Sequence, residues 1–240
     1  MKAFSITDIG ERRAINQDYV FCIETQIGCL PNLFIVADGM GGHNAGDYAS
    51  RFSVEHFIKC VQKSTMGTPF EVFERAIKET NEALLKIETE QIEYEGMGTT
   101  FVAATCFEDT LYVANVGDSR LYIINDGIKQ ITQDHSLVEE MVRSGKINKS
   151  EARVHPNKNV ITRALGVDST VEPDCFEVPI NTGDIVLMCS DGLTNMLEDS
   201  EIMNIINYYK EDIEITARQL VSEANHHGGK DNIGVVLVKL

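Results

Sequence analysis

Short strand-like runs that come in blocks, with helical segments between the blocks, most constrain the fold of this chain. β-branched runs bounded by Gly, Asp or Asn are typical of strands, and a three-to-four spacing of apolar residues is typical of helices. Because helices do not follow every strand, the pattern favours antiparallel sheets with helices packed outside them over a doubly wound parallel sheet. The predicted strands are 3–8, 19–24, 33–37, 101–107, 111–116, 120–125, 128–133, 185–189 and 233–240.

Helical spacing occurs in residues 45–61, 73–87, 202–206 and 213–224. The segment at about 134–162 is polar and mixed, with a short helical piece at its start, which predicts a functional flap rather than core. No repeat or low-complexity linker divides the 240 residues. We therefore expect one α+β domain over residues 1–240.

The charge and cysteine content exclude several classes of partner. The formal net charge is −16, which disfavours nucleic acid and anionic membrane surfaces. No apolar run is long enough to span a bilayer, and no secretion signal is evident. Six cysteines without a Cys-x-x-Cys pair are typical of reduced thiols rather than of a zinc site. We expect a cytoplasmic protein, with a monomer as the default.

Aspartates recur where the predicted apolar strands begin or end. Three follow a strand and stand beside a glycine, and two stand immediately before a strand. In an antiparallel sheet the end of one strand lies beside the start of the next, so these residues can gather at one edge. They are Asp18, Asp38, Asp118, Asp191 and Asp231.

Such a cluster needs cations or protons. Two carboxylates at about 4 Å repel by about 4 kcal/mol at an effective dielectric near 20. Oxygen ligands select hard ions, namely Mg²⁺, Mn²⁺ or Ca²⁺. Glycines after Asp38 let the backbone approach closely, so a carbonyl could add a ligand. A single Asp-Gly pair is typical of a turn, and we interpret Asp126 and Asp184 in that way. Spacing alone leaves both a metal site and plain turns open.

Eight ordered segments add a resemblance to a known family. They are residues 13–18 (Arg-Ala-Ile-Asn-Gln-Asp), 38–43 (Asp-Gly-Met-Gly-Gly-His), 98–100, 115–120, 134–137, 161–166, 189–193 and 230–233. On these segments the chain resembles the PP2C-type (PPM) metal-dependent protein phosphatases, in particular the bacterial branch, over essentially its whole length. The resemblance implies a β-sandwich of two antiparallel sheets flanked by helices.

The resemblance also implies a metal centre with two core Mg²⁺ or Mn²⁺ ions and a third ion. Asp38 would bridge two ions, and the carbonyl of Gly39 would ligate one of them. Asp191 and Asp231 would complete the shell of the other ion. Asp118, together with Asp191, would help to hold the third.

The implied reaction is hydrolysis of phosphoserine and phosphothreonine in proteins by a metal-bridging hydroxide, opposing a bacterial Ser/Thr kinase. Arg13 would bind the substrate phosphate with its forked guanidinium, and Asp18 would hold metal-bound water. Two positions depart from other members of the family. Met40 stands where some animal members have a histidine, and Gln17 where others have a glutamate, which leaves the proton donor to the leaving group open.

Two other functions are compatible with a cluster of aspartates. A two-metal phosphodiesterase or nuclease uses similar carboxylates, but the negative charge counts against it. A pseudophosphatase that serves as a regulatory binding module would not need all of the aspartates named above. The single loop histidines His43, His135 and His155 are expected to be exposed and are not assigned to the metal shell.

Overall fold

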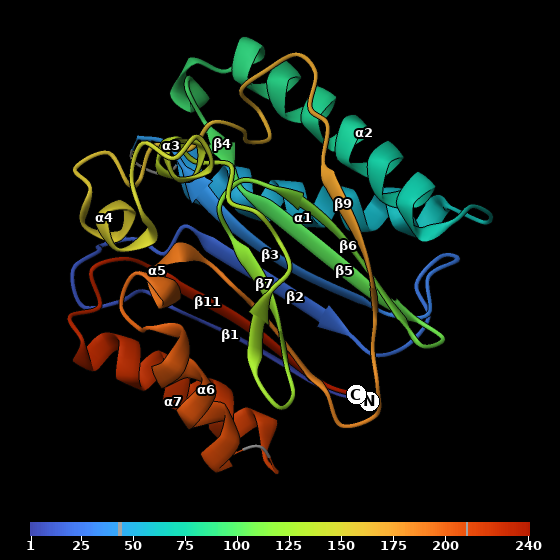
Figure 1. Cartoon of the computed structure of the whole chain (residues 1–240). Coiled ribbons are helices and arrows are strands. Elements are labelled where there is room, and N and C mark those ends of the chain that lie inside the picture. The colour runs from blue at the N-terminus through green and yellow to red at the C-terminus, as the bar shows by residue number, and fades with distance from the viewer. Residues whose placement is uncertain (43–44, 210) are drawn as a thin grey trace.

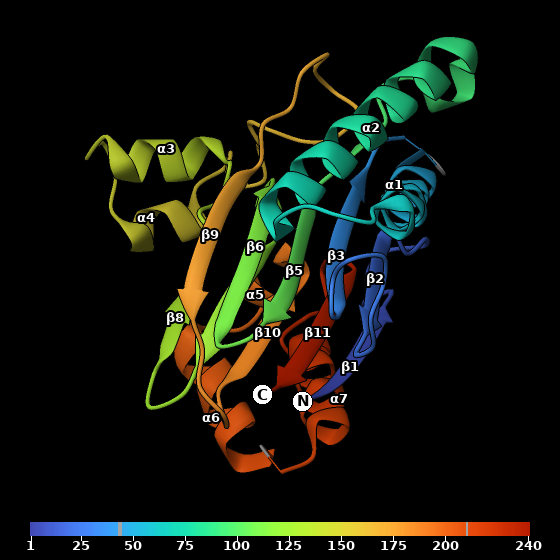
Figure 2. The same ribbon diagram turned by 90° about the vertical axis from the view of Figure 1, so that its right-hand side faces the viewer.

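The structure, a computed structural model, describes residues 1–42, 45–209 and 211–240. In these residues two antiparallel β-sheets face each other, and helices cover the outer side of each sheet, as Figure 1 and Figure 2 show. This α/β/β/α layering confirms the predicted fold class. Among the described helices, none is both long and apolar enough to cross a membrane.

The first sheet brings together strands from the two ends of the sequence. β1 (Lys2–Asp8) pairs along its whole length with β11 (Ile233–Lys239). The order β1-β11-β10-β7-β8 is antiparallel throughout. The other strands of this sheet are β10 (Ile185–Cys189), β7 (Arg120–Ile124) and β8 (Ile128–Gln130).

The second sheet has the order β2-β3-β5-β6-β9. β2 (Asp18–Ile23) pairs with β3 (Leu33–Met40) in a register that sets Asp18 opposite Asp38. The remaining strands are β5 (Phe101–Phe107), β6 (Thr110–Val116), β9 (Asp174–Pro179) and β4 (Gly98–Thr99), a short strand that pairs with the end of β3.

Long helices cover the two outer faces. α1 (Ala45–Lys63) and α2 (Pro69–Glu90) pack on the second sheet, whereas α6 (Asp199–Tyr209) and α7 (Ile213–His226) pack on the first. α2 begins with a capping box, in which Thr68 and Glu71 satisfy each other's backbone N–H groups. The shorter helices are α3 (Leu137–Arg143), α4 (Lys149–Val154), α5 (Asp191–Thr194) and the 3₁₀ helix η1 (Ile92–Tyr94).

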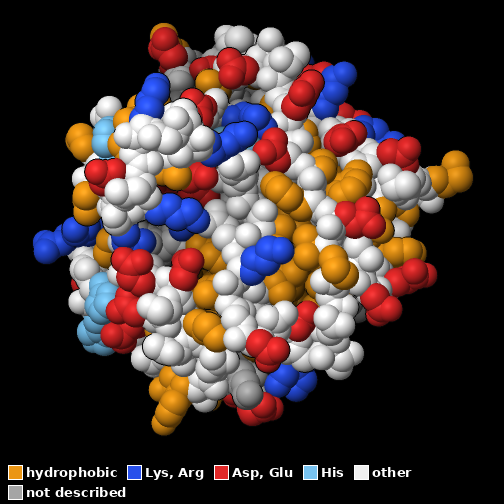
Figure 3. Space-filling model, viewed as in Figure 1, with side chains coloured by type: hydrophobic (Ala, Val, Ile, Leu, Met, Phe, Trp, Pro, Cys, Tyr) orange, Lys and Arg blue, Asp and Glu red, His pale blue; other side chains and the backbone are white. Residues whose placement is uncertain are grey.

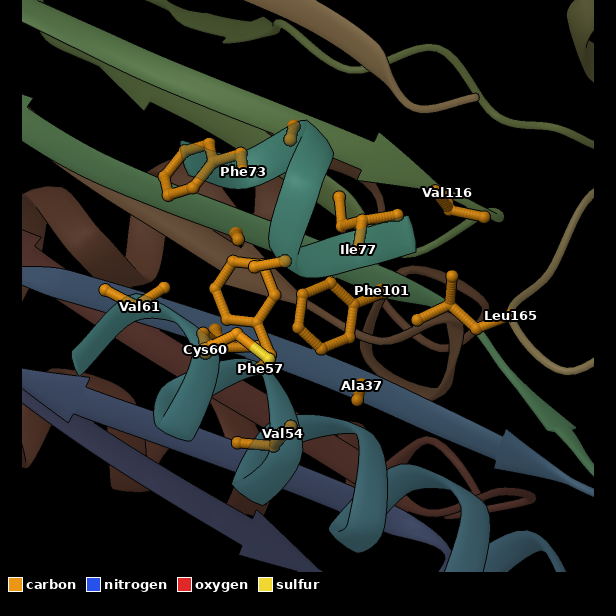
Figure 4. Packing of buried hydrophobic residues seen from close by; sticks show 14 of the residues in the cluster. Ala37, Val54, Phe57, Cys60, Val61, Phe73, Ile77, Phe101, Val116 and Leu165 are labelled. Carbon is orange, nitrogen blue, oxygen red and sulfur yellow. The ribbon is translucent and has the colours of Figure 1, made fainter. Parts of the chain in front are cut away.

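Apolar side chains fill the space between the sheets and beneath each pair of long helices. Figure 4 shows the layer under α1 and α2, where the ring centroid of Phe57 lies 4.9 Å from that of Phe101 and 5.9 Å from that of Phe73. Burying a phenylalanine side chain stabilises a fold by about 1.5–3 kcal/mol. This packing fixes α1 against the second sheet, in which β3, the strand that carries Asp38, also contacts α1.

Several elements differ from the prediction. β3 continues through Asp38 to Met40 instead of ending at Ala37, because its last residues pair with β4. β9 was not predicted: among the described strands it is an edge strand that pairs with β6 alone, and it carries partly exposed residues and ends at Pro179. The short helices α4 and α5 were also missed. The predicted helical piece at the start of the flap is confirmed as α3.

Candidate metal centre and active site

A pocket of about 230 Å³ opens at one end of the sandwich, where ends of strands from both sheets meet. The structure brings every predicted metal-ligating aspartate to this pocket, together with Gly39 and Arg13. Asp18 lies behind the lining rather than in it. The aspartates that line the pocket are Asp38, Asp118, Asp191 and Asp231.

Asp38 and Asp18 form the inner part of the site, where Asp18 is buried and Asp38 is partly exposed to the pocket. They lie directly opposite each other on β3 and β2, and opposite residues of an antiparallel pair point to the same face. The backbone N–H of Asp38 donates to the hydroxyl of Thr100 at 3.0 Å, and its carbonyl accepts from the N–H of Thr100 at 2.9 Å. The hydroxyl of Ser190 donates to Oδ2 of Asp18 at 2.6 Å. Hydrogen bonds therefore hold the backbone of Asp38 and the carboxylate of Asp18 in place.

Gly39 allows helix α1 to approach the pocket. A Cβ at this position would collide with the backbone carbonyl of Gly46 in the first turn of α1. The N–H of Gly39 donates to the carbonyl of Gln17 at 3.0 Å, which ties the residue to the segment before β2. A larger residue would push α1 away from the pocket that Gly39 lines.

Gly192 allows the segments that carry Asp191 and Asp231 to approach each other closely. Asp191 opens α5 directly after β10, and Asp231 precedes the neighbouring strand β11. A Cβ on Gly192 would collide with the backbone carbonyl of Asn232, so glycine lets the two segments come this close. Oδ2 of Asp191 accepts a 2.8 Å hydrogen bond from Nδ2 of Asn195.

Asp118 lies in the turn between β6 and β7, and its side chain is almost fully buried. The N–H of Gly117 donates to Nδ1 of His135 at 3.0 Å, and the carbonyl of Gly117 accepts from the N–H of His135 at 3.0 Å. The prediction that His135 is exposed is wrong, because the base of the flap encloses it and its Nε2 lies 3.1 Å from Oδ2 of Asp174. His135 supports the turn that carries Asp118.

Arg13 reaches the pocket from the loop before β2. Its Nη2 lies 2.7 Å from Oδ2 of Asp231, and the Arg13 side chain is 46% exposed. Exposed ion pairs stabilise a protein by about 0–1 kcal/mol. Another anion can therefore compete for this guanidinium at little cost.

Burial dominates the electrostatics of the cluster. Burial raises the pKa of Asp18 to about 7 and the pKa of Asp191 to about 6, and the charges of neighbouring aspartates add to both shifts. Burial, together with repulsion from the other aspartates, also raises the pKa of Asp38 and of Asp118 well above the usual range. A bound cation would offset this repulsion.

The donor set fits a hard divalent cation. It consists of carboxylate and carbonyl oxygens, which Mg²⁺ and Mn²⁺ prefer, and Oδ1 of Asp18 is buried without a hydrogen-bond partner. Among the described residues, no three Asp, Glu, His or Cys side chains converge as closely as they would around an ion.

The raised pKa values predict an unusual dependence of stability on pH. The ordinary pKa of an aspartate is 3.8, so between about pH 4 and pH 7 folded Asp18 and Asp191 keep protons that the unfolded chain has released. The free energy of unfolding in EDTA should therefore fall by a few kcal/mol, at about 1.4 kcal/mol per pKa unit and group, as the pH rises through this window. Urea unfolding measured at a series of pH values checks this.

Asp18→Asn is the matched variant, because it removes the titrating group and keeps the shape of the side chain. It should show a shallower fall in unfolding free energy over the same pH range. Saturating Mn²⁺ should raise the stability of the wild-type protein most near neutral pH. Equal pH dependence in the two proteins would contradict the raised pKa of Asp18.

The two Asp-Gly or Gly-Asp aspartates that the sequence assigned to turns lie outside the site, whereas the residues that hydrogen-bond to the site aspartates were not predicted. Asp126 lies in the β7–β8 hairpin, and Oδ2 of Asp184 accepts a 3.0 Å hydrogen bond from the N–H of Asn181, so both aspartates belong to turns as predicted. Ser190 and Asn195 stand one residue before and four residues after Asp191. The helical spacing of Asp191 and Asn195 was the available signal. His43 lies outside the described residues.

Comparison with known proteins gives the family. The model of the family "Protein phosphatase 2C" matches residues 30–233. The serine/threonine phosphatase stp of Listeria innocua is 42% identical over 238 residues, which cover 97% of this chain and 93% of that protein. A solved serine/threonine phosphatase of S. agalactiae superposes with a TM-score of 0.92 at 35% identity, and the match covers 100% of this chain and 99% of that one.

A second solved structure holds metal. The catalytic domain of the serine threonine protein phosphatase PstP, in complex with two manganese ions, superposes with a TM-score of 0.86 at 31% identity and covers 98% of this chain and 96% of that one. The pocket of carboxylates described above lies in a chain that matches these phosphatases over nearly its full length. The chain belongs to the protein phosphatase 2C family, whose members are metal-dependent serine/threonine phosphatases.

Proposed function

We propose that this chain hydrolyses phosphoserine and phosphothreonine in proteins at the pocket that Asp38, Asp118, Asp191 and Asp231 line. The observation that carries the proposal is the meeting of these carboxylates with Arg13 at one end of the sandwich. The relatives named serine/threonine phosphatase support the substrate class. The partners would be phosphorylated proteins, including those modified by a cognate Ser/Thr kinase.

We propose the same metal ligands that the resemblance to PP2C-type phosphatases implies. Asp38 would join two Mn²⁺ or Mg²⁺ ions, with the carbonyl of Gly39 on one and the carboxylates of Asp191 and Asp231 on the other. Asp118 would hold a third ion. When bound, the ions would activate water for attack on phosphorus and offset the charge of the phosphoryl group.

The protein's own groups would bind the substrate and order the water. Arg13 would exchange its contact with Asp231 for the phosphoryl oxygens, which a forked guanidinium matches. That exchange would also release Asp231 for its ion. Because the hydroxyl of Ser190 already engages Oδ2 of Asp18, Oδ1 of Asp18 is the atom that would orient a water molecule.

The surface supports a protein substrate rather than a nucleic acid. The net charge is −16, and Figure 3 shows acidic and basic side chains interspersed over the face that it presents. Nucleic-acid binding needs cationic groups along the phosphate backbone. We further propose a single domain that acts as a cytoplasmic monomer and binds neither nucleic acid nor membrane.

The choice between monoesters and diesters tests the function. With Mn²⁺, phosphate release from a phosphothreonine peptide and hydrolysis of p-nitrophenyl phosphate should both exceed hydrolysis of bis(p-nitrophenyl) phosphate by at least about 10²-fold. Preference for the diester would favour a phosphodiesterase. A chain that binds phosphopeptide and Mn²⁺ without turnover would be a pseudophosphatase, the alternative function.

Arg13→Ala should raise KM for the phosphothreonine peptide by about tenfold, because one bidentate charged contact is worth about 1.5–3 kcal/mol where it forms. The Mn²⁺ dissociation constant should not rise, since Arg13 offers no ligand and its removal frees Asp231 from the ion pair. Steady-state kinetics and calorimetry measure the two quantities. Arg12→Ala is the neighbouring control, and an unchanged KM in Arg13→Ala would remove Arg13 from its assigned role.

A further inference from the structure

Asn195 lies between a predicted metal ligand and the flap. Its Nδ2 donates to Oδ2 of Asp191 at 2.8 Å, and its Oδ1 accepts from Nζ of Lys158 at 2.7 Å. Asn195 also follows α5, and its backbone N–H donates to the carbonyl of Asp191 at 2.7 Å. The side-chain amide of Asn195 thus connects Asp191, in the first turn after β10, to Lys158, which lies 37 positions before Asn195 in the chain.

The two contacts fix the orientation of the amide. A flipped side chain would place Oδ1 of Asn195 against the carboxylate of Asp191 and the amide NH₂ against the ammonium of Lys158, and both contacts would be repulsive. Partial burial lowers the pKa of Lys158, and the negative charge of Asp191 counteracts part of that shift. Because Asn195 holds Oδ2 of Asp191 in a hydrogen bond, it sets the direction in which the carboxylate presents its remaining lone pairs to an ion.

Lys158 belongs to the flap segment that borders the active site. Asn159 and Ile161, which follow it closely, line the same pocket as Asp191. A larger cavity of about 710 Å³ lies between the flap and the α5–α6 region, and Lys158 and Asn195 both line it. Asp118 and Asp191 line both pockets, so the two spaces meet at the predicted metal ligands.

A second link between flap and core passes near the first without involving Asn195. Nη1 of Arg153 donates to the carbonyl of Thr194 at 2.9 Å, and Nε of Arg153 lies 2.7 Å from Oε1 of Glu198. Figure 1 shows α4, the flap helix that carries Arg153, near α5. This link holds the flap in place but reaches no predicted metal ligand, so the two links can be separated by mutation.

We propose that Asn195 is a positioning residue that orients the carboxylate of Asp191 for its ion, and that Lys158 acts through Asn195 to couple the flap to the metal centre. This inference rests on the proposed function, since it assumes that Asp191 binds a divalent ion. Hydrogen bonds that orient a ligating side chain typically change metal affinity by 10–100-fold. A ligand that moves the edge of the flap would then alter ion binding as well.

The test is calorimetric titration with Mn²⁺ alone, at one pH, of the wild-type protein, Asn195→Ala, Lys158→Met and the double variant. Asn195→Ala should weaken Mn²⁺ binding by about tenfold. Lys158→Met should weaken it by at least about threefold in the wild-type background. In the Asn195→Ala background it should weaken binding less, because the relay through Asn195 is gone and the two direct effects of the ammonium, its attraction for the Asp191 carboxylate and its repulsion of the ions, oppose each other.

Arg153→Leu is the matched control, because it breaks the other link of the flap. It should leave Mn²⁺ affinity unchanged, and Lys158→Arg, which keeps a cationic donor, should restore most of the affinity lost in Lys158→Met. Equal weakening by Lys158→Met in both backgrounds, or equal weakening by Arg153→Leu, would overturn the coupling through Asn195.

Different outcomes of this titration would refute the positioning role of Asn195 and the proposed metal centre. A wild-type protein that binds no Mn²⁺ would refute the proposed metal centre itself. Normal binding by the wild-type protein together with unchanged binding by a folded Asn195→Ala variant would refute only the positioning role. Far-ultraviolet circular dichroism establishes folding, and Asn195→Ser serves as the second variant if Asn195→Ala unfolds.

Discussion

Asp38→Asn should lower kcat/KM for a phosphothreonine peptide by about 10³-fold or more, because it removes the carboxylate proposed to join the two ions. The substituted side chain keeps its shape, so β3 should keep its pairing with β2. The loss of one buried acidic group should also raise the unfolding free energy in EDTA at neutral pH, since burial raises the pKa of Asp38. Lower activity with higher stability separates a functional defect from misfolding.

Asp126→Asn is the control for this variant. Asp126 also precedes a glycine, but it lies in the β7–β8 hairpin, and the substitution changes the net charge by the same amount. Activity within about twofold of wild type is expected. If Asp38→Asn kept more than about a tenth of the wild-type kcat/KM, Asp38 would not be the central ligand.

Gly192→Ala should reduce activity by about 10²-fold, although it removes no ligand. The added Cβ would collide with the backbone carbonyl of Asn232, so α5 and the segment before β11 must separate. Overpacking of this kind costs about 1–3 kcal/mol of stability, and displacing a catalytic group by about 1 Å can cost about 10²-fold in rate. Kinetics, Mn²⁺ titration and urea unfolding of the same sample measure the three effects.

Gly127→Ala offers the matched comparison, because a Cβ at Gly127 meets no atom within 4 Å. It should leave the rate and the Mn²⁺ affinity unchanged. Wild-type Mn²⁺ affinity in Gly192→Ala would show that Asp191 and Asp231 need not lie close together. The role assigned to Gly192 would then be wrong.

The sandwich was predictable because its inner strands are continuous apolar runs. Residues 33–37, for example, are all buried, as a continuous apolar run of strand length predicts. β9 escaped prediction because its partly exposed residues, including Glu177, weaken the apolar pattern of this edge strand. α5 is a single turn that packs closely against Asn232, the residue directly before β11, and no local pattern reveals this contact.

The aspartates of the site were predictable from their positions at strand ends, because antiparallel pairing brings such ends together. Their supporting contacts were not, since these join segments far apart in the chain. Ser190 meets Asp18 across 172 positions, and Arg13 meets Asp231 across 218. His135 shows the same limit: as a loop residue it gave no local sign of the burial that the flap imposes.

The most direct test of the central claim is phosphate release from a phosphothreonine peptide by wild-type protein that has been stripped with EDTA and then titrated with Mn²⁺. The carboxylate pocket predicts no turnover in the stripped protein and recovery of turnover as the two core ions bind, with the calorimetric and kinetic titrations of those two ions coinciding. Turnover that persists in EDTA, or that fails to follow the binding of Mn²⁺, would contradict a metal-dependent phosphatase centre built on Asp38, Asp191 and Asp231.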